Sequence, residues 1–263
     1  MADFTKITDA IKSIAPEALQ ESWDNSGIQV SPDSAKDYKR IMTALEISDG
    51  VVQEAVEKGV DMIVTHHPLI FSKLASVSDT ATVGNQIITL IKNNIAVYSA
   101  HTSFDSAAGG TNSYLAEKIG LTESVPMIPA PGGEPDEGMG RVGRYASPLI
   151  FGVFLHKLET AMGKDSIRIA GNPPQSVETV ALCTGSGAEF IDLARELGAD
   201  VYITGDLKYH DARHADDTGF CVIDAGHHGT EVIFAENMAE KLRAALGENV
   251  EIIVSETDIY PFR

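Results

Sequence analysis

A gapless internal repeat constrains the fold of this chain more than any other feature of its sequence. Residues 42–65 (MTALEISDGVVQEAVEKGVDMIVT) align with residues 181–204 (ALCTGSGAEFIDLARELGADVYIT) at a constant shift of 139 positions. The identical positions of the two copies include Ala55/Ala194, Gly59/Gly198, Asp61/Asp200 and Thr65/Thr204. Each copy reads as strand, helix, glycine stop and strand, the pattern of a βαβ unit. The repeat therefore predicts two related α/β lobes.

Apolar segments rich in β-branched residues alternate with helix-like segments along the chain. The strand-like segments are 40–47, 61–65, 95–100, 178–184, 200–204, 220–224 and 249–254, and the helix-like segments are 49–58, 82–93, 188–197 and 231–246. Strands separated by helices indicate mostly parallel sheets. The predicted fold class is thus α/β, with two structurally related lobes that each contain a mostly parallel sheet.

Residues 121–148 interrupt this alternation with many prolines and glycines, which is typical of a connection between lobes. We place the first lobe at residues 1–125 plus 231–263 and the second, inserted lobe at 126–230, with no extra inserted domain. Residues 138–143 (GMGRVG) match the dinucleotide fingerprint formally. That fingerprint must follow a buried strand and open a helix, and this segment follows PGGEPDE instead. A glycine-rich entry to a strand is the better interpretation.

The composition excludes several classes of function. Acidic residues outnumber basic ones 38 to 20, and the net charge is −18 without a basic cluster, which disfavours general nucleic-acid binding. A small anionic substrate such as a nucleotide fits this charge only where bound cations reverse the local field. No apolar run is long enough for a membrane span, and the first residues lack a signal-peptide pattern. Cys183 and Cys221 lie in apolar segments, which indicates buried structural thiols. We expect a cytoplasmic protein that does not bind membranes.

Seven of the eight histidines lie in three clusters, and only His156 stands apart. The clusters are His66-His67, His101 and a later group of His210, His214, His227 and His228. The pair His66-His67 follows DMIVT, His101 follows IAVYSA, and His227 follows FCVIDAG. In open α/β sheets ligands bind outside the carboxyl ends of the strands. The histidines at these three strand ends are therefore expected to converge.

Carboxylates accompany these histidines at a repeated spacing. His101-xxx-Asp105 aligns with His227-xxx-Glu231 at a shift of 126 positions. Imidazole and carboxylate donors without nearby cysteine suit zinc, iron or manganese and argue against a closed structural zinc site. Adjacent side chains on an extended segment point to opposite sides, so neighbouring histidines suit two ions better than one. We predict two divalent metal ions per subunit in a cleft between the lobes, with the ligands His66, His67, Asp105, His227 and Glu231.

Each of these motifs also has a purely structural interpretation. A lone His-His pair commonly ends a strand with surface or hydrogen-bonded imidazoles, and Glu231 could simply complement a helix N-terminus. The conjunction of three such motifs, each after a strand, favours metal binding. His214 and His228 are interpreted as surface residues or neighbours of the ligands.

Two further residues in the segment TGDLKYHD are candidate catalytic groups, Asp206 and His210. Asp206 occupies the repeat position of His67, so it can orient a metal ligand or transfer protons. A solvated side chain is the simplest interpretation of Lys208, and a structured turn is the simplest interpretation of Trp23-Asp24-Asn25.

Several motifs together resemble the Nif-three-like family, whose members are also described as type 2 GTP cyclohydrolase I homologues. The motifs are SWDNSGIQV at 22–30, VTHHPLIF at 64–71, AHTSFDSAAGGTN at 100–112, GMGRVG at 138–143, TGDLKYHDA at 204–212 and DAGHHGTE at 224–231. The resemblance implies a two-lobe α/β subunit with a dinuclear metal centre in the interlobe cleft, and assembly into a toroidal homohexamer. It implies that the ligands are His66, His67, Asp105, His227 and Glu231, and that His101 is a neighbour of the ligands.

Three functions are compatible with this sequence. The first is a metal-dependent hydrolase with chemistry of the GTP cyclohydrolase type, which the resemblance suggests. The second is a two-metal hydrolase of phosphoesters or amides. The third is a non-catalytic, metal-binding hexameric scaffold or interaction protein.

Overall fold

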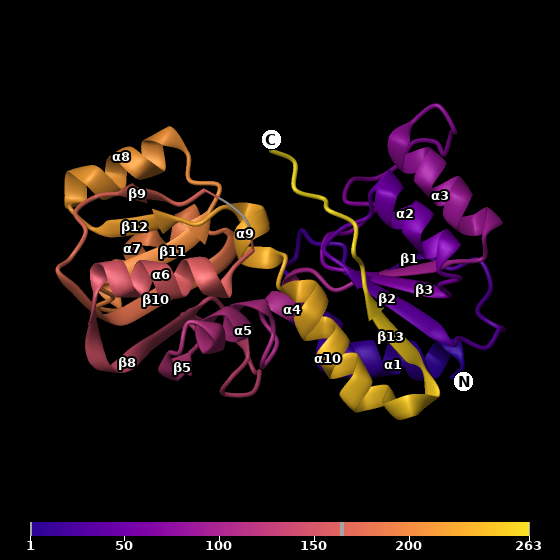
Figure 1. Cartoon of the computed structure of the whole chain (residues 1–263), viewed down its shortest axis with the longest axis horizontal. Helices are drawn as coiled ribbons and strands as arrows, with labels where there is room; N and C mark the ends of the chain where they lie inside the picture. The colour runs from indigo at the N-terminus through magenta and orange to yellow at the C-terminus, as the bar shows by residue number, and fades with distance from the viewer. Residues whose placement is uncertain (1, 164–165, 263) are drawn as a thin grey trace. The chain divides into compact units, whose positions relative to one another are not determined.

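The computed structural model describes residues 2–163 and 166–262. The chain folds into two compact units, one made of Met1–Phe104 with Phe234–Arg263 and the other of Asp105–Ile233 (Figure 1). The second unit is therefore inserted in the first. The divisions fall after residues 104 and 233 rather than after 125 and 230. The difference arises because the strand at Thr122–Val125 pairs with the sheet of the second unit.

The sheet of the first unit is mostly parallel, as predicted. Its five strands lie in the order β1 (Gly27–Val30), β4 (Ala96–Ser99), β3 (Met62–Thr65), β2 (Arg40–Ala44) and β13 (Glu251–Val254). The last four strands run parallel, and β1 adds to β4 in the antiparallel direction.

Helices cover both faces of this first sheet (Figure 1). On one face lie α1 (Phe4–Ile14) and α10 (Phe234–Leu246), and on the other lie α2 (Asp49–Glu57) and α3 (Thr82–Lys92). Neighbouring residues of β2 serve opposite faces: Ile41 packs with α1 and α10, and Met42 packs with α2 and α3. Ser48 begins α2 by accepting a hydrogen bond from the Val51 amide, as a helix N-cap does.

The sheet of the second unit is mixed, which differs from the mostly parallel sheet that the sequence predicts. Its strands lie in the order β5 (Thr122–Val125), β8 (Arg141–Ile150), β10 (Ser176–Ser186), β11 (Val201–Gly205), β12 (Cys221–Asp224) and β9 (Arg168–Ala170). The strands β10, β11 and β12 are parallel, and the other three pair antiparallel. Part of this difference comes from the predicted connection at 121–148, which supplies β5 and most of β8. A small ribbon of β6 (Ile128–Pro129) and β7 (Gly138–Met139) also forms there.

Two apolar clusters, one on each face, hold the second sheet against its helices. On one face lie α5 (Thr111–Lys118) and α6 (Phe151–Ala161), and on the other lie α7 (Ile191–Glu196) and α8 (Tyr209–Thr218). The buried thiols of Cys221 and Cys183 belong to these two clusters, one to each, in agreement with a structural role.

The internal repeat is confirmed in atomic detail. Met42 pairs with Ile63 between β2 and β3, and Ala181 pairs with Tyr202 between β10 and β11, so the register is identical at the shift of 139. The Asp61 carboxylate accepts hydrogen bonds from the amides of residues 39 and 40 at 2.7 and 3.0 Å. The equivalent Asp200 accepts from the amides of residues 178 and 179, both at 2.8 Å. Sequence similarity in this segment therefore reflects the same local structure.

The strand that follows each repeat copy also has the same position in both units, and the two units first differ at Gly226, an inserted residue. The strand β3 pairs with β4 through Met62 and Ala96, and β11 pairs with β12 through the matching residues Val201 and Cys221. After these strands Gly226 is an additional residue with φ of 77°, a conformation that glycine adopts readily. It precedes α9 (His227–Glu231), whereas α4 (Thr102–Asp105) follows His101 directly.

Within the part of the chain that the structure describes, no helix has the length and apolar character required to cross a bilayer.

Candidate metal centre

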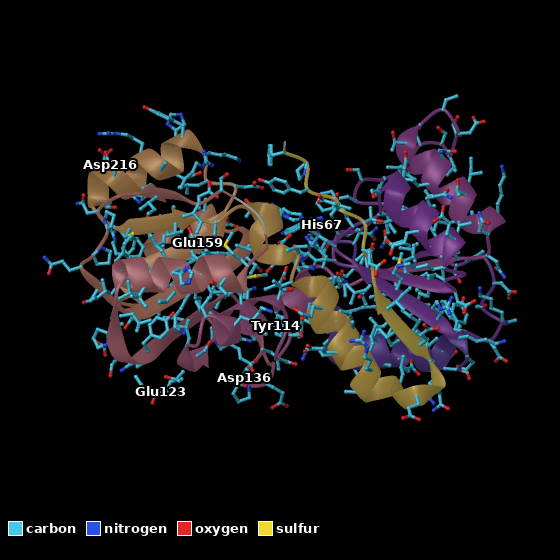
Figure 2. The ribbon with its side chains drawn as sticks, in the orientation of Figure 1. His67, Tyr114, Glu123, Asp136, Glu159 and Asp216 are labelled. Carbon is cyan, nitrogen blue, oxygen red and sulfur yellow. The ribbon has the colours of Figure 1, made fainter. Side chains whose placement is uncertain are left out.

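The predicted metal ligands form two sets, one in each unit. His66 and His67 belong to the first unit and follow β3, where Figure 2 labels His67. Asp105, His227 and Glu231 belong to the second unit, where the last two lie on α9 after β12. Both sets contain nitrogen or oxygen donors at the carboxyl ends of strands, where open α/β sheets bind ligands.

The first set also includes His101. His66, His67 and His101 each offer a ligand atom within 4.8 Å of the others, and the rings of His66 and His101 lie 5.0 Å apart. The amides of His66 and His67 both donate to the Leu45 carbonyl, at 3.0 and 2.9 Å. The chain therefore turns here, and the two rings lie 5.2 Å apart instead of on opposite sides of an extended strand.

A common feature of both sets is an oxygen acceptor at Nδ1 of each ring. His66 Nδ1 lies 3.1 Å from the Ala100 carbonyl oxygen. His67 Nδ1 lies 3.1 Å from the Glu46 carboxylate. His101 Nδ1 lies 2.8 Å from the Asp24 carboxylate. His227 Nδ1 lies 2.7 Å from the Asp206 carboxylate. An Nδ1–H that donates to oxygen selects the tautomer with its lone pair on Nε2, and metal-binding histidines generally have this arrangement. The four imidazole rings thus have the hydrogen-bonding arrangement that is typical of metal-binding histidines.

Asp24 was missed as part of the site by sequence reasoning. Its side chain is fully buried and accepts hydrogen bonds from the Ser26 hydroxyl and from the amide and hydroxyl of Thr102, in addition to its contact with His101. Burial alone would raise the pKa of Asp24, but hydrogen bonds from His101, Thr102 and Ser26 hold it well below its ordinary value. The carboxylate therefore stays ionised and fixes the orientation of His101. The contact joins residues 77 positions apart, so no local pattern reveals it.

In the second unit two buried carboxylates lie close together. Asp105 and Glu231 are 6% and 3% exposed, and their ligand oxygens lie within 4.8 Å of one another. Glu231 Oε2 also lies 2.9 Å from His227 Nε2, because residues four apart share a face of α9. Buried carboxylates at this separation favour a bound cation or a shared proton, since two negative charges repel strongly away from water.

Small residues make room for this second set. A Cβ atom on Gly185 would collide with the Glu231 carboxylate, so only glycine fits there. Asn112 connects the neighbouring segments: its amide nitrogen donates to the Asp105 carbonyl at 3.2 Å, and its oxygen accepts from the Thr184 amide at 2.8 Å. The donors are thus tied to β10 through backbone groups.

Asp206, a candidate catalytic residue, orients His227. Its φ of 54° is positive, which aspartate tolerates better than most residues. In this conformation its carboxylate lies 2.7 Å from His227 Nδ1. This contact fixes the ring of His227, and the role of His227 as a metal ligand stays a prediction.

The remaining candidates from the same region lie outside both donor sets. His210 is exposed, and its ring packs edge-on against Tyr209. His214 contacts Asp192 at 3.0 Å on the exposed side of α8. Lys208 is the residue before α8, and its amide donates to the Asp211 carboxylate.

The two cysteines are buried free thiols. Burial, followed by the negative charges of Asp105 and Glu189, raises the pKa of Cys183 well above its ordinary value. Burial raises the pKa of Cys221 to about 12. Neither thiol belongs to the donor clusters found among the described residues, so the donor chemistry there consists of imidazole and carboxylate, which fits zinc, iron or manganese.

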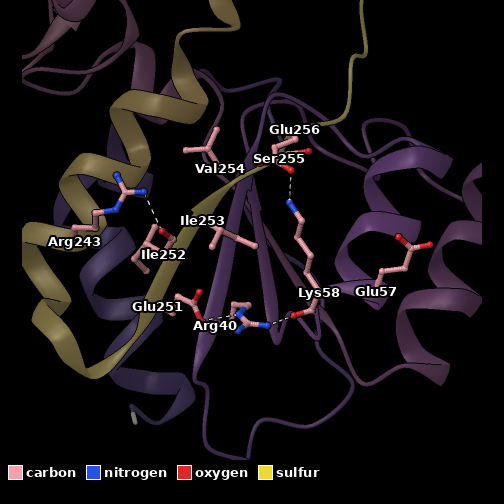
Figure 3. A pocket seen from close by; sticks show the side chains of 10 residues that line it. All are labelled: Arg40, Glu57, Lys58, Arg243, Glu251, Ile252, Ile253, Val254, Ser255 and Glu256. Carbon is pink, nitrogen blue, oxygen red and sulfur yellow. Dashed lines mark hydrogen bonds and ion pairs between the residues drawn. The ribbon is translucent and has the colours of Figure 1, made fainter.

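A separate hollow of about 680 Å³ lies beside β13 in the first unit (Figure 3). Its basic side chains already have partners: Arg40 contacts Glu251, Lys58 contacts Glu54 and Glu256, and Arg243 donates to the Ile252 carbonyl. These contacts compensate the positive charges that line the hollow and hold the edge strand β13 in place. They do not indicate a ligand.

Comparisons with known proteins agree with this architecture. A model of the family Duf34/NIF3 (NGG1p interacting factor 3) matches residues 2–261. The chain is 36% identical over 256 residues to a "GTP cyclohydrolase 1 type 2 homolog" of Clostridium perfringens, with 97% of each chain covered. A protein of the same description from Clostridium acetobutylicum is 35% identical, with 98% of this chain and 97% of the relative covered.

Solved structures show the same fold. A Bacillus cereus protein related to NIF3 has a TM-score of 0.90 at 24% identity, and the match covers 100% of this chain and 99% of that one. Reduced HcgD from Methanocaldococcus jannaschii has a TM-score of 0.82 at 30% identity, with 97% and 98% covered. The match of the family model over nearly the whole chain, together with these relatives, shows that this chain belongs to the Duf34/NIF3 family.

Proposed function

We propose that this chain binds two divalent metal ions through His66, His67, Asp105, His227 and Glu231, and acts as a metal-dependent hydrolase of the GTP cyclohydrolase type. The observation that carries the proposal is the oxygen acceptor at Nδ1 of each imidazole, which orients Nε2 for coordination. Two buried carboxylates supply negative charge that a cation would neutralise.

Bound divalent ions supply two effects that suit hydrolysis, because they lower the pKa of water and offset the charge of an anionic substrate. The second effect matters here, since the chain carries a net charge of −18. The chain's own residues orient the ligands: Glu46 holds His67, and Asp206 holds His227. The names of the relatives support a purine nucleotide as the substrate.

Elemental analysis of the purified protein tests the metal-binding part. We expect about two ions per chain in the wild type and a loss of at least one in Glu231→Ala. Glu240→Ala, at an exposed position of α10, is the matched control and retains both ions. Equal metal content in all three proteins would reject the assignment of Glu231.

Turnover of GTP tests the hydrolase part. Protein loaded separately with zinc, manganese or iron is incubated with GTP, and release of formate is measured against an Asp105→Ala variant. Release by the wild type alone supports the cyclohydrolase chemistry. The absence of formate with every metal would reject that chemistry while leaving metal binding intact. A panel of phosphoester and amide substrates then separates another hydrolase from a scaffold that binds metal without turnover.

A further inference from the structure

Two large aromatic side chains lie exposed and adjacent in the first unit. Trp23 is 61% exposed and Phe71 is 59% exposed, and their ring centroids lie 6.2 Å apart with 55° between the ring planes. Both rings also pack edge-on against His101, at 5.8 Å and 6.2 Å. His101 in turn belongs to the histidine set with His66 and His67. An exposed aromatic pair therefore borders the donors of the first unit.

Hydrogen bonds hold the two rings in this arrangement. Asn25, directly after Trp23 and Asp24, donates from its side chain to the Ile70 carbonyl at 2.7 Å, and Ile70 precedes Phe71. Gln29 accepts from the Ile70 amide at 3.1 Å. The buried carboxylate of Asp24, the residue after Trp23, accepts hydrogen bonds from His101 and Thr102. The three residues Trp23-Asp24-Asn25 thus join the Phe71 loop to the His101 segment, which gives the rings a fixed position before any ligand binds.

The extent of the pair indicates a small molecule. A buried aromatic side chain covers about 150–250 Å², so two rings about 60% exposed offer roughly 200–300 Å². A stable protein partner covers roughly 800 Å² on each side, which is several times more. The π-face of an indole also prefers another flat, polarisable ring over an aliphatic chain, and this preference is independent of base identity.

We propose that Trp23 and Phe71 form a stacking platform for the planar heteroaromatic ring of a small-molecule substrate beside the histidine set of the first unit. The inference rests on the proposed function for the reaction that follows binding, but the platform itself needs only the residues of this unit. The ring of the substrate stacks on the exposed aromatic side chains, and the polar part of the substrate extends toward His101 and its neighbours.

The single tryptophan of the chain makes the proposal directly measurable. Stacking of a purine on Trp23 quenches its fluorescence, so the purified protein is titrated with adenosine and with guanosine, corrected for their absorption. Ribose 5-phosphate, which has no aromatic ring, is the control ligand. We expect saturable quenching by both nucleosides and none by the sugar phosphate. Quenching by all three compounds, or by none of them, would overturn the proposal.

Variants that retain Trp23 identify the platform. Removing a stacking partner generally weakens binding by about 5- to 150-fold, and we expect a loss in this range for Phe71→Ala. Asn25→Ala keeps both rings but removes the bond to Ile70, so a smaller loss is expected. Phe262→Ala removes another exposed phenylalanine, 68% exposed, and should leave binding unchanged. Equal affinity in the Phe71 variant and the wild type, with matching circular dichroism spectra, would contradict the assignment.

The same titration separates this inference from the proposed function. It is repeated with chelator-treated and zinc-loaded protein, alongside the measurement of metal content. Ring-specific quenching that depends on Phe71 in both preparations supports the platform, whether or not GTP is turned over. Metal binding without ring-specific quenching would reject the platform and leave the proposed metal centre in place.

Discussion

The two copies of the repeat have the same backbone but carry different chemistry where their second strands end. The strands β2 and β3 pair in the same register as β10 and β11, and an aspartate bonds the same two amides in each copy. After the second strand the first copy continues with His66-His67, and the second continues with Gly205-Asp206. One copy thus supplies imidazole donors, and the other supplies the carboxylate that orients a donor. The duplicated framework therefore fixes the positions of the side chains, while their chemical roles differ between the copies.

The same divergence occurs after the first strand of each copy. Glu46 holds His67 in the first unit, whereas the equivalent position in the second unit is Gly185, where a side chain would collide with Glu231. Each difference between the copies is therefore tied to a specific neighbour, and each can be tested by mutation.

The largest effect on stability is expected for Gly205→Ala, which adds a methyl group at the position of His66 in the other copy. A Cβ atom there would lie 2.6 Å from both the Gly185 carbonyl oxygen and the His227 amide nitrogen. Because both are backbone atoms, we expect the free energy of unfolding to fall by about 3 kcal/mol. Urea denaturation measures the change. Gly152→Ala, in α6 with no atom within 4 Å, is the control and should be neutral or stabilising by about 0.5–1 kcal/mol.

A smaller effect is expected on metal affinity when the residues that orient the ligands are removed. Asp206→Ala and Glu46→Ala should each weaken zinc binding by about 10- to 100-fold, since each carboxylate selects the tautomer of its histidine. Competition with a zinc-sensitive dye measures the affinity. Asp216→Ala, which only breaks a surface contact with Arg213, serves as the control. Unchanged affinity in both test variants would show that these contacts do not support coordination.

The matched aspartates of the repeat should have comparable effects on stability. Asp61→Ala and Asp200→Ala each remove two hydrogen bonds from backbone amides to a carboxylate, and we expect a loss of about 1–2 kcal/mol for each. Asp61 also contacts Lys36 at 3.0 Å, so its loss should be the larger one. Chemical denaturation of the single and double variants measures the loss of unfolding free energy at each site. A negligible effect at only one of the two sites would break the equivalence of the copies.

The smallest effect concerns Glu54, whose repeat position in the second unit is Leu193. Burial raises the pKa of Glu54, but hydrogen bonds from Lys58, Ser255 and Thr257 lower it from 4.5 to about 2. A lowered folded-state pKa stabilises the protein above pH 4.5, and this contribution disappears as the pH falls towards 2. After screening by solvent we expect Glu54→Gln to cost about 1 kcal/mol at neutral pH. Denaturation at several pH values should show the difference between variant and wild type vanishing in acid; a constant difference would contradict it.

The parts of the fold that depend on local patterns could be predicted from the sequence. The repeat, the strands at 40–44 and 201–205 and the donors after β3 and β12 follow from apolar periodicity and from the general position of ligands at strand ends. The sequence indicates only the glycine-rich entry to a strand at 138–143 and not the full length of β8. One buried residue of β8 is Arg141, which is 2% exposed and donates to the Ser113 hydroxyl and the Asp136 carbonyl. A buried arginine resembles a surface residue in sequence, so the periodicity of this strand fails.

The parts of the site that depend on distant contacts could not be predicted. Asp24 and Glu46 contact histidines 77 and 21 positions away, and nothing near them in sequence indicates these partners. The repeat relates Asp206 to His67, and this internal comparison singled out a residue whose carboxylate contacts His227, 21 positions away.

The orientation of the histidine rings is the central claim, and nitrogen-15 NMR of histidine-labelled protein tests it most directly. Long-range proton–nitrogen spectra before and after addition of zinc should show His66, His67 and His227 with the proton on Nδ1 and with Nε2 shifted by the metal. Rings that bind zinc through Nδ1, or that do not respond to zinc at all, would contradict the account.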